Sequence, residues 1–132
     1  MELRRYRKNW HRRPEKVDSS MFVAFWADQK FVSALDAEGV EWLLAGKDTL
    51  KSIEAGDPSL TRIHRGTLAR VEAFERLGAR NLRRTGLRAY TRDNYCRIAG
   101  REFAISRKCK SAVYERFVAH AALQPLPAEV AA

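Results

Sequence analysis

Several features that identify common classes of protein are scarce or missing in this 132-residue chain. Its only cysteines are Cys96 and Cys109, too few for the disulfide framework of a secreted protein or for a four-ligand zinc site. The longest apolar run, Met21 to Ala27, covers seven residues, whereas a membrane-spanning helix needs about 20. We therefore expect a reduced, cytoplasmic setting and no membrane partner.

Motifs for catalysis and cofactor binding are also missing. His11, His64 and His120 are scattered, and no pair has the spacing of metal ligands. Residues 45–49 contain Gly-Lys-Asp-Thr but lack the upstream glycine of a phosphate-binding loop. We predict no cofactor, no metal and no enzymatic activity. A small metal-independent ribonuclease using His64 or His120 is kept as a third hypothesis.

What the chain has in excess is positive charge, with 25 Lys and Arg residues against 16 Asp and Glu residues. The charge balance is +5 over residues 1–16, −5 over residues 17–58 and +9 over residues 59–132. Between Ser59 and Arg107 every basic residue is an arginine, whose planar guanidinium fits phosphate oxygens and stacks on flat rings. This segregation indicates a polyanionic partner, and nucleic acid is the one that we expect.

The residue pattern predicts an α+β fold that is mostly α, with four N-terminal and central helices, a short β-hairpin and a C-terminal helix. The run Met21–Ala27 fits either a buried strand or a helix, and its alanines favour a helix. The predicted helices cover residues 21–35, 37–45, 48–55, 60–77 and 107–123, and the hairpin strands cover 95–98 and 101–105. We expect a basic flexible arm over residues 1–16, a single compact domain over 17–123 and a disordered tail over 124–132.

Arginines are the candidate binding residues. On the helix predicted over 60–77, Arg62, Arg65 and Arg76 would project from one face while apolar residues cover the other. Tyrosines and a tryptophan interleaved with other arginines are candidates for stacking on bases. The candidate phosphate contacts are Arg4, Arg5, Arg7, Lys8, Arg12, Arg13, Arg62, Arg65, Arg76, Arg80, Arg83, Arg84, Arg88, Arg92, Arg97, Arg101, Lys108 and Lys110. The candidate stacking residues are Tyr6, Trp10, Tyr90 and Tyr95.

Two short stretches resemble known families. Residues 49–56, followed by Thr-Leu-Ala-Arg-Val at 67–71, resemble the second half of the helix-turn-helix of phage repressors. The order of helix, strands and a helix opening at Ser106 is similar to that of a double-stranded RNA-binding domain. Each resemblance covers less than half of the chain, and neither implies particular functional residues here.

We therefore predict a non-enzymatic nucleic-acid-binding protein, such as a small regulator, a phage or plasmid accessory factor, or a ribonucleoprotein subunit. Neutralising about six phosphates would lower its affinity roughly 10³-fold between 50 and 200 mM salt. The alternative is an interaction or inhibitor protein whose basic face docks on an acidic protein partner, within an assembly or a homo-oligomer. In either case, acids of residues 17–58 could mask the arginines.

Overall fold

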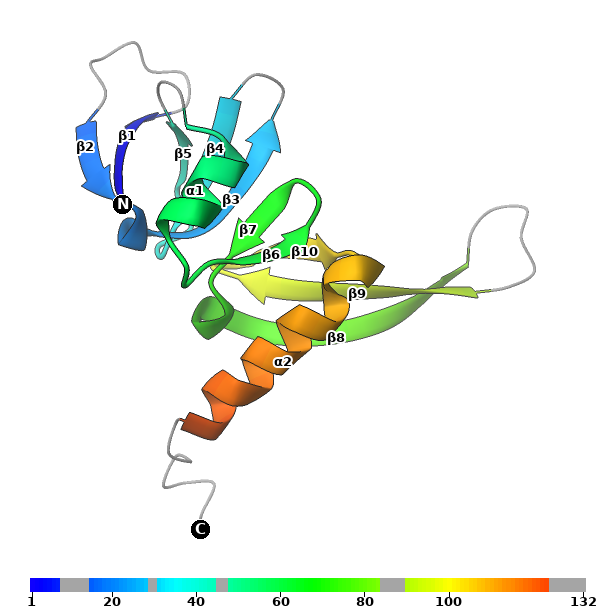
Figure 1. The fold of residues 1–132 in the computed structure, drawn as a ribbon. Helices are drawn as coiled ribbons and strands as arrows, with labels where there is room; N and C mark the ends of the chain where they lie inside the picture. The colour runs from blue at the N-terminus through cyan, green and yellow to red at the C-terminus, as the bar shows by residue number, and fades with distance from the viewer. Residues whose placement is uncertain (8–14, 29–30, 45–47, 84–89, 124–132) are drawn as a thin grey trace.

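The computed structural model describes residues 1–7, 15–28, 31–44, 48–83 and 90–123, with residues 6–7, 80–83 and 90–92 described by their backbone alone. These residues form ten strands in two antiparallel sheets and two α-helices. The chain is therefore mostly β, and the prediction of a mostly helical fold was wrong (Figure 1).

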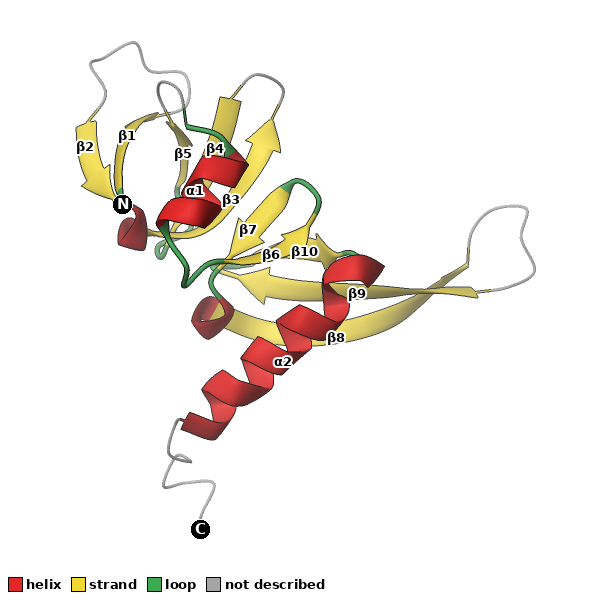
Figure 2. Cartoon of the chain, viewed as in Figure 1, coloured by secondary structure: helices red, strands yellow, loops and turns green. Residues whose placement is uncertain are grey.

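The larger sheet has seven strands in the order β2-β1-β5-β4-β3-β7-β6, and the smaller one has three in the order β10-β9-β8. The seven are β1 (Glu2–Arg7), β2 (Glu15–Asp18), β3 (Phe22–Asp28), β4 (Phe31–Asp36), β5 (Glu41–Leu44), β6 (Thr61–His64) and β7 (Thr67–Ala69). The smaller sheet contains β8 (Phe74–Arg83), β9 (Tyr90–Ile98) and β10 (Arg101–Ile105). The helices are α1 (Leu50–Gly56) and α2 (Arg107–Leu123), with 3₁₀ turns at Ser19–Met21 and Val71–Ala73 (Figure 2).

The segment predicted as a helix over residues 21–35 is the hairpin of β3 and β4. Phe22, Ala24 and Phe25 are fully buried, and most residues of β4 are buried. A strand in the middle of a sheet covered on both faces has no polar side to show, so its sequence is a continuous apolar run. Burial on both faces outweighed the helix propensity of the alanines.

The helix predicted over residues 37–45 is a turn followed by β5. Asp36 does accept hydrogen bonds from the backbone amides of Glu38 and Val40, as a helix cap would. However, its own amide donates to the carbonyl of Val40, and Gly39 has a φ of +86°, so the chain reverses instead of coiling. Trp42 Nε1 donates to the same carboxylate and fixes β5 beside the turn.

The prediction of one amphipathic helix over residues 60–77 was also wrong. These residues form β6, β7, a 3₁₀ turn and the start of β8. Leu68 and Ala69 pack into opposite cores, an alternation that a strand between two layers requires. Arg62, Arg65 and Arg76 therefore lie on β6, on the β6–β7 turn and on β8 instead of on one helix face.

Three local predictions were confirmed. Helix α1 forms close to its predicted position, with a capping box between Thr49 and Ser52. Strands β9 and β10 pair as a hairpin around Ala99 and Gly100, both at positive φ as a two-residue turn of type I′ requires. Helix α2 covers the predicted span and begins after Ser106, whose hydroxyl accepts from the amide of Cys109.

Residues 2–7, expected in a basic arm, are extended and form β1, which pairs with β2 on one side and β5 on the other. The arm residues 8–14 and the predicted tail, 124–132, lie outside the described residues. The division into arm, domain and tail stays a prediction. Neither described helix has the length and apolar character needed to cross a membrane.

Two hydrophobic cores lie on opposite faces of the larger sheet. One is closed by α1, through Leu50 and Ile53, and the other lies between the larger sheet, the smaller sheet and α2. Fully buried Val113 anchors α2 in the second core. Arg116 holds the same helix beside β6 by donating to the carbonyl of Leu60 at 2.9 Å and to the hydroxyl of Thr61 at 2.7 Å.

A buried ion pair joins the residue that follows α1, Asp57, to the residue that follows β7, Arg70. Arg70 and Asp57 are 2.6 Å apart, and their side chains are only 8% and 12% exposed. Arg70 also donates to the carbonyls of Phe22 and Ser19, while Asp57 accepts from the Ser19 hydroxyl. Burial opposes ionisation of Asp57, but the hydrogen bonds and charge of Arg70 and the serine hydroxyls outweigh it and hold its pKa well below the usual value.

Neither family resemblance extends through the fold. Among the described residues, the element before α1 is strand β5, so α1 has no preceding helix with which to form a helix-turn-helix. The order β8-β9-β10-α2 does match strands followed by a helix, but strand β7 and a 3₁₀ turn precede it in place of the first helix of a double-stranded RNA-binding domain.

Candidate nucleic-acid interface

Acids of the N-terminal half neutralise several of the predicted arginines. Arg5 pairs with Glu15 at 3.2 Å, and Arg62 pairs with Glu54 at 3.0 Å. Arg101 pairs with Glu41, whose sequence position is 60 residues away. These guanidinium groups already have an anion, with which a phosphate would have to compete.

Other basic side chains are exposed and form no ion pair within the described part of the chain. They are Arg4, Lys51, Arg65, Arg76, Arg97, Arg107, Lys108 and Arg116. Internal neutralisation is therefore partial.

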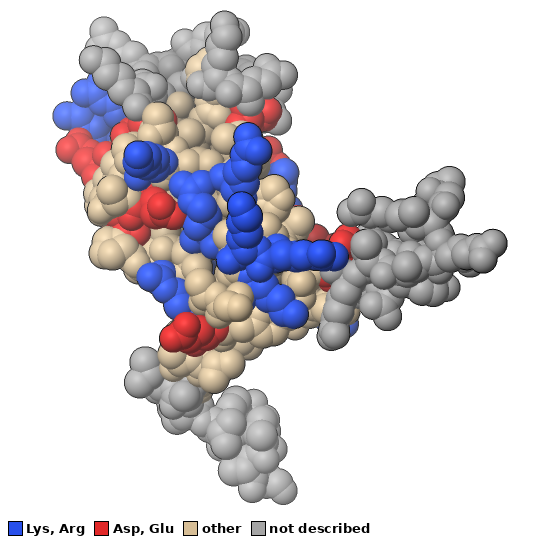
Figure 3. Space-filling view, turned by 45° about the vertical axis from the view of Figure 1, so that its right-hand side comes forward, with Lys and Arg blue, Asp and Glu red and all other residues tan. Residues whose placement is uncertain are grey.

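Four basic residues gather where the β6–β7 turn meets the start of α2. Arg65 lies in the turn, and Arg107, Lys108 and Lys110 lie in the first turn of α2. The amide of Ser106 donates to the carbonyl of Ile63 at 2.9 Å, which fixes the start of α2 beside β6. We call these four residues the basic surface. Figure 3 shows Lys and Arg side chains gathered across the middle of the face that it draws.

The three cations in the first turn of α2 are unfavourable for the stability of that helix. A helix N-terminus bears partial positive charge and favours acids, yet the first turn of α2 has none. Lys110 lies over the ring of Tyr114, with Nζ 5.8 Å from the ring centroid. The cations and the helix dipole therefore add to one positive field, which an approaching anion would relieve.

The outer face of the smaller sheet carries both signs of charge. Arg76 and Arg97 are cross-strand neighbours, and exposed Asp93 and Glu102 share this face. The ring of Tyr95 lies against Gly78, where a Cβ atom would approach the tyrosine hydroxyl to 3.1 Å. Tyr95 thus covers a glycine, consistent with a role in hairpin packing, and this face is less positive than the basic surface.

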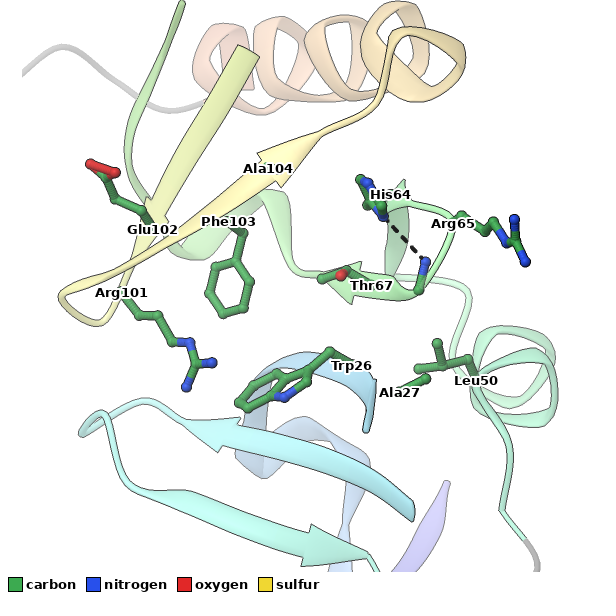
Figure 4. Close-up of a pocket in the computed structure, with 11 residues that line it drawn as sticks. Trp26, Ala27, Leu50, His64, Arg65, Thr67, Arg101, Glu102, Phe103 and Ala104 are labelled. Atoms are coloured by element: carbon green, nitrogen blue, oxygen red, sulfur yellow. Dashed lines mark hydrogen bonds between the residues drawn. The ribbon is translucent and has the colours of Figure 1, made fainter. Parts of the chain in front are cut away.

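A cleft of about 700 Å³ separates the β6–β7 turn from β10, next to the basic surface. In Figure 4, Arg101, Phe103 and Thr67 point toward the space beside Trp26, whereas Arg65 points outward at the rim. The remaining lining residues are Ala27, Leu50, His64, Gly66, Glu102 and Ala104. The cleft therefore combines an aromatic floor with one cation, Arg65, at its rim, and the exposed acid Glu102 also lines it.

Arg101 is the most constrained cation of the cleft. Its guanidinium carbon lies 4.2 Å from the ring centroid of Trp26 and 5.5 Å from that of Phe103. The ion pair with Glu41 fixes the same group from another side, yet 41% of the Arg101 side chain stays exposed. Arg101 is thus a fixed planar surface whose charge already has a counter-ion.

Acid–base and metal chemistry find little support in the described residues. His64 lines the cleft and its Nδ1 accepts weakly from the amide of Gly66 at 3.5 Å, whereas His120 lies near the other end of α2. No group of three or more His, Cys, Asp or Glu side chains in the described ranges could hold a metal ion. The hypothesis of a ribonuclease stays untested.

Many predicted contacts cannot be placed. Residues Lys8, Trp10, Arg12, Arg13, Arg84 and Arg88 lie outside the described residues. Tyr6 and Arg7 lie on β1, Arg80 and Arg83 on β8, and Tyr90 and Arg92 on β9, where only the backbone is described. Figure 1 shows β8 and β9 reaching away from the rest of the molecule as a long ribbon.

The structure also adds residues that the sequence analysis missed. Arg107 belongs to the basic surface, and its position beside Lys108 after a helix cap was the available signal. Trp26 and Phe103 meet in the cleft with ring centroids 5.7 Å apart, although they lie 77 positions apart in the sequence. No local pattern predicts that contact.

Comparisons of this chain with protein-family models, with curated proteins and with solved structures gave no match.

Proposed function

We propose that this protein is a non-enzymatic nucleic-acid-binding protein that grips phosphates with the basic surface. The observation that carries the proposal is that the β6–β7 turn with Arg65 lies beside the first turn of α2 with Arg107, Lys108 and Lys110, and that none of the four forms an ion pair with another described residue. The net charge of +9 supports the same class of partner. The unpaired thiols of Cys96 and Cys109 are in keeping with a reducing, cytoplasmic location.

The strength of binding should depend steeply on salt. If the four cations each neutralise one phosphate, affinity falls about 10²-fold between 50 and 200 mM salt, because counterions are released on binding. A larger fall would mean that arginines of the β8–β9 ribbon or of residues 8–14 add contacts. A biological role as a regulator, a phage or plasmid accessory factor, or a ribonucleoprotein subunit is compatible with such binding.

The test is fluorescence anisotropy with labelled DNA and RNA oligonucleotides at several salt concentrations. Arg65→Ala should weaken binding several-fold and reduce the salt slope by about one, because one phosphate contact is lost. Lys16→Ala is the matched control, since it removes the same charge from β2 at the opposite edge of the larger sheet. Lys16→Ala should change neither quantity.

Three results would overturn the proposal. A salt slope near zero, or no binding at 50 mM salt, would exclude phosphate contacts. Equal losses for Arg65→Ala and Lys16→Ala would show that only the net charge matters. Co-purification of a defined acidic polypeptide in place of nucleic acid would favour the interaction protein instead.

A further inference from the structure

We infer that the cleft between the β6–β7 turn and β10 binds one unpaired nucleotide of a single strand, with its base stacked on Arg101 and its phosphate outside at Arg65. This inference rests on the proposed function, and it adds the class of nucleic acid that the protein selects. It gives Arg101 a different role from the phosphate contact that we expected.

The first step of the argument is that Arg101 is ready to stack. A guanidinium is planar and stacks on flat rings, and here Trp26 lies 4.2 Å beneath it. Because Glu41 and Trp26 already hold the side chain, little rotamer entropy remains to be lost when a base binds. The exposed part of the group is then a platform that extends the tryptophan ring toward the cleft.

The second step is the size and chemistry of the space. A volume of about 700 Å³ lies within the range of about 300–1,000 Å³ typical of small-molecule sites. Phe103 and Trp26 supply flat apolar surface, and the hydroxyl of Thr67 is a polar group directed into the same space. Aromatic surface with a few polar groups suits a nucleobase, since every base has a π face and a polar edge.

The third step is the distribution of charge around the cleft. Arg65 lies at the rim and points away from the cleft, and the rest of the basic surface begins just beyond the end of β10. A nucleotide bound this way would place its base inside and its charged backbone along the cations. Bases of a duplex are already stacked and paired, so they cannot enter without unpairing. The cleft should therefore favour single strands.

The experiment compares affinities for a single-stranded 15-mer and for the matching duplex, as DNA and as RNA, at one salt concentration. Arg101→Lys keeps the charge beside Glu41 but loses the planar platform. We expect it to bind the single strand about 10-fold more weakly and the duplex with unchanged affinity. Arg97→Lys, on the outer face of the smaller sheet, is the control and should bind both as the original protein does. Thermal melts confirm that both variants fold.

A measurement on the unaltered protein guards against a folding defect in Arg101→Lys. Photocrosslinking with a single strand that carries 4-thiothymidine or 4-thiouridine should label peptides containing Trp26 or Phe103. Crosslinks only to other segments would overturn the inference.

The two proposals fail in different ways. If Arg101→Lys weakens neither ligand, or weakens both equally, the inference is wrong, while the salt slope and the Arg65→Ala result can still support the proposed function. If no oligonucleotide binds, both proposals are wrong. Crosslinking with DNA but not RNA, or the reverse, identifies which of the two nucleic acids the cleft binds.

Discussion

Replacement of Asp57 by asparagine should lower the free energy of unfolding strongly, although it barely changes the size of the side chain. Asp57→Asn keeps the size of the side chain but removes the charge that faces Arg70 at 2.6 Å. Both side chains are close to fully buried, so Arg70 would be left charged in a place where water cannot reach it. Removing one partner of a buried pair typically costs about 3–5 kcal/mol.

The magnitude for this site should lie at the lower end of that range. Arg70 would still donate to the carbonyls of Phe22 and Ser19, which partly solvate its charge. We therefore expect a loss of about 3 kcal/mol in the free energy of unfolding. Because a domain of ordinary stability has about 5–15 kcal/mol, this is a large fraction of the total.

The assay is urea unfolding followed by tryptophan fluorescence and circular dichroism. Glu54→Gln is the matched control, since Glu54 also pairs with an arginine, Arg62, but those side chains are 40% and 30% exposed. A pair so exposed is worth about 0–1 kcal/mol. If Asp57→Asn cost no more than Glu54→Gln, burial would not govern these ion pairs, and the reasoning would be refuted.

Three further outcomes are expected. Burial opposes ionisation of Asp36 and Asp57, but hydrogen bonds and charge outweigh it and hold the pKa of both below the usual 3.8. The two carboxylates therefore stabilise the fold above about pH 4, and this contribution is lost as the pH falls through their lower pKa values in the folded protein. Unfolding measured over a range of acid pH should show this loss of stability, and Asp57→Asn should make the pH dependence flatter. Ala99 has a φ of +49°, a backbone conformation that is strained for a residue with a side chain. Ala99→Gly should relieve this strain and raise the free energy of unfolding, measured by urea titration, by about 1 kcal/mol. A loss of stability would contradict the proposed strain. Burial raises the pKa of the Cys96 thiol to about 12. A thiol reagent should therefore modify half-buried Cys109 first and react with Cys96 only in denaturant. Equal modification rates of the two thiols in the folded protein would contradict the buried position of Cys96.

Features that depend on neighbours a few residues apart were predictable. The capping box of Thr49, the turn at Ala99 and Gly100, and the cap at Ser106 each join residues no more than three positions apart. These hydrogen bonds need no partner from a distant part of the chain. For that reason α1, the β9–β10 hairpin and α2 all appear close to their predicted positions.

The central strands were not predictable in the same way. In the pairing of β3 with β7, Ala24 lies opposite Ala69, and both are fully buried. A run such as Met21–Ala27 suits a buried helix as well as a buried strand, because both are apolar on every side. Only the partners brought from distant parts of the chain decide between the two.

The same division applies to the candidate site. The sequence by itself determined the sign and amount of charge, the arginine-rich composition and the basic residues at the start of α2. Tertiary structure decided which arginines keep that charge available, because Glu41, Glu54 and Asp57 reach Arg101, Arg62 and Arg70 only after folding. The cleft has the same origin, since its walls come from strands that are distant in sequence, and burial of two apolar cores brings them together.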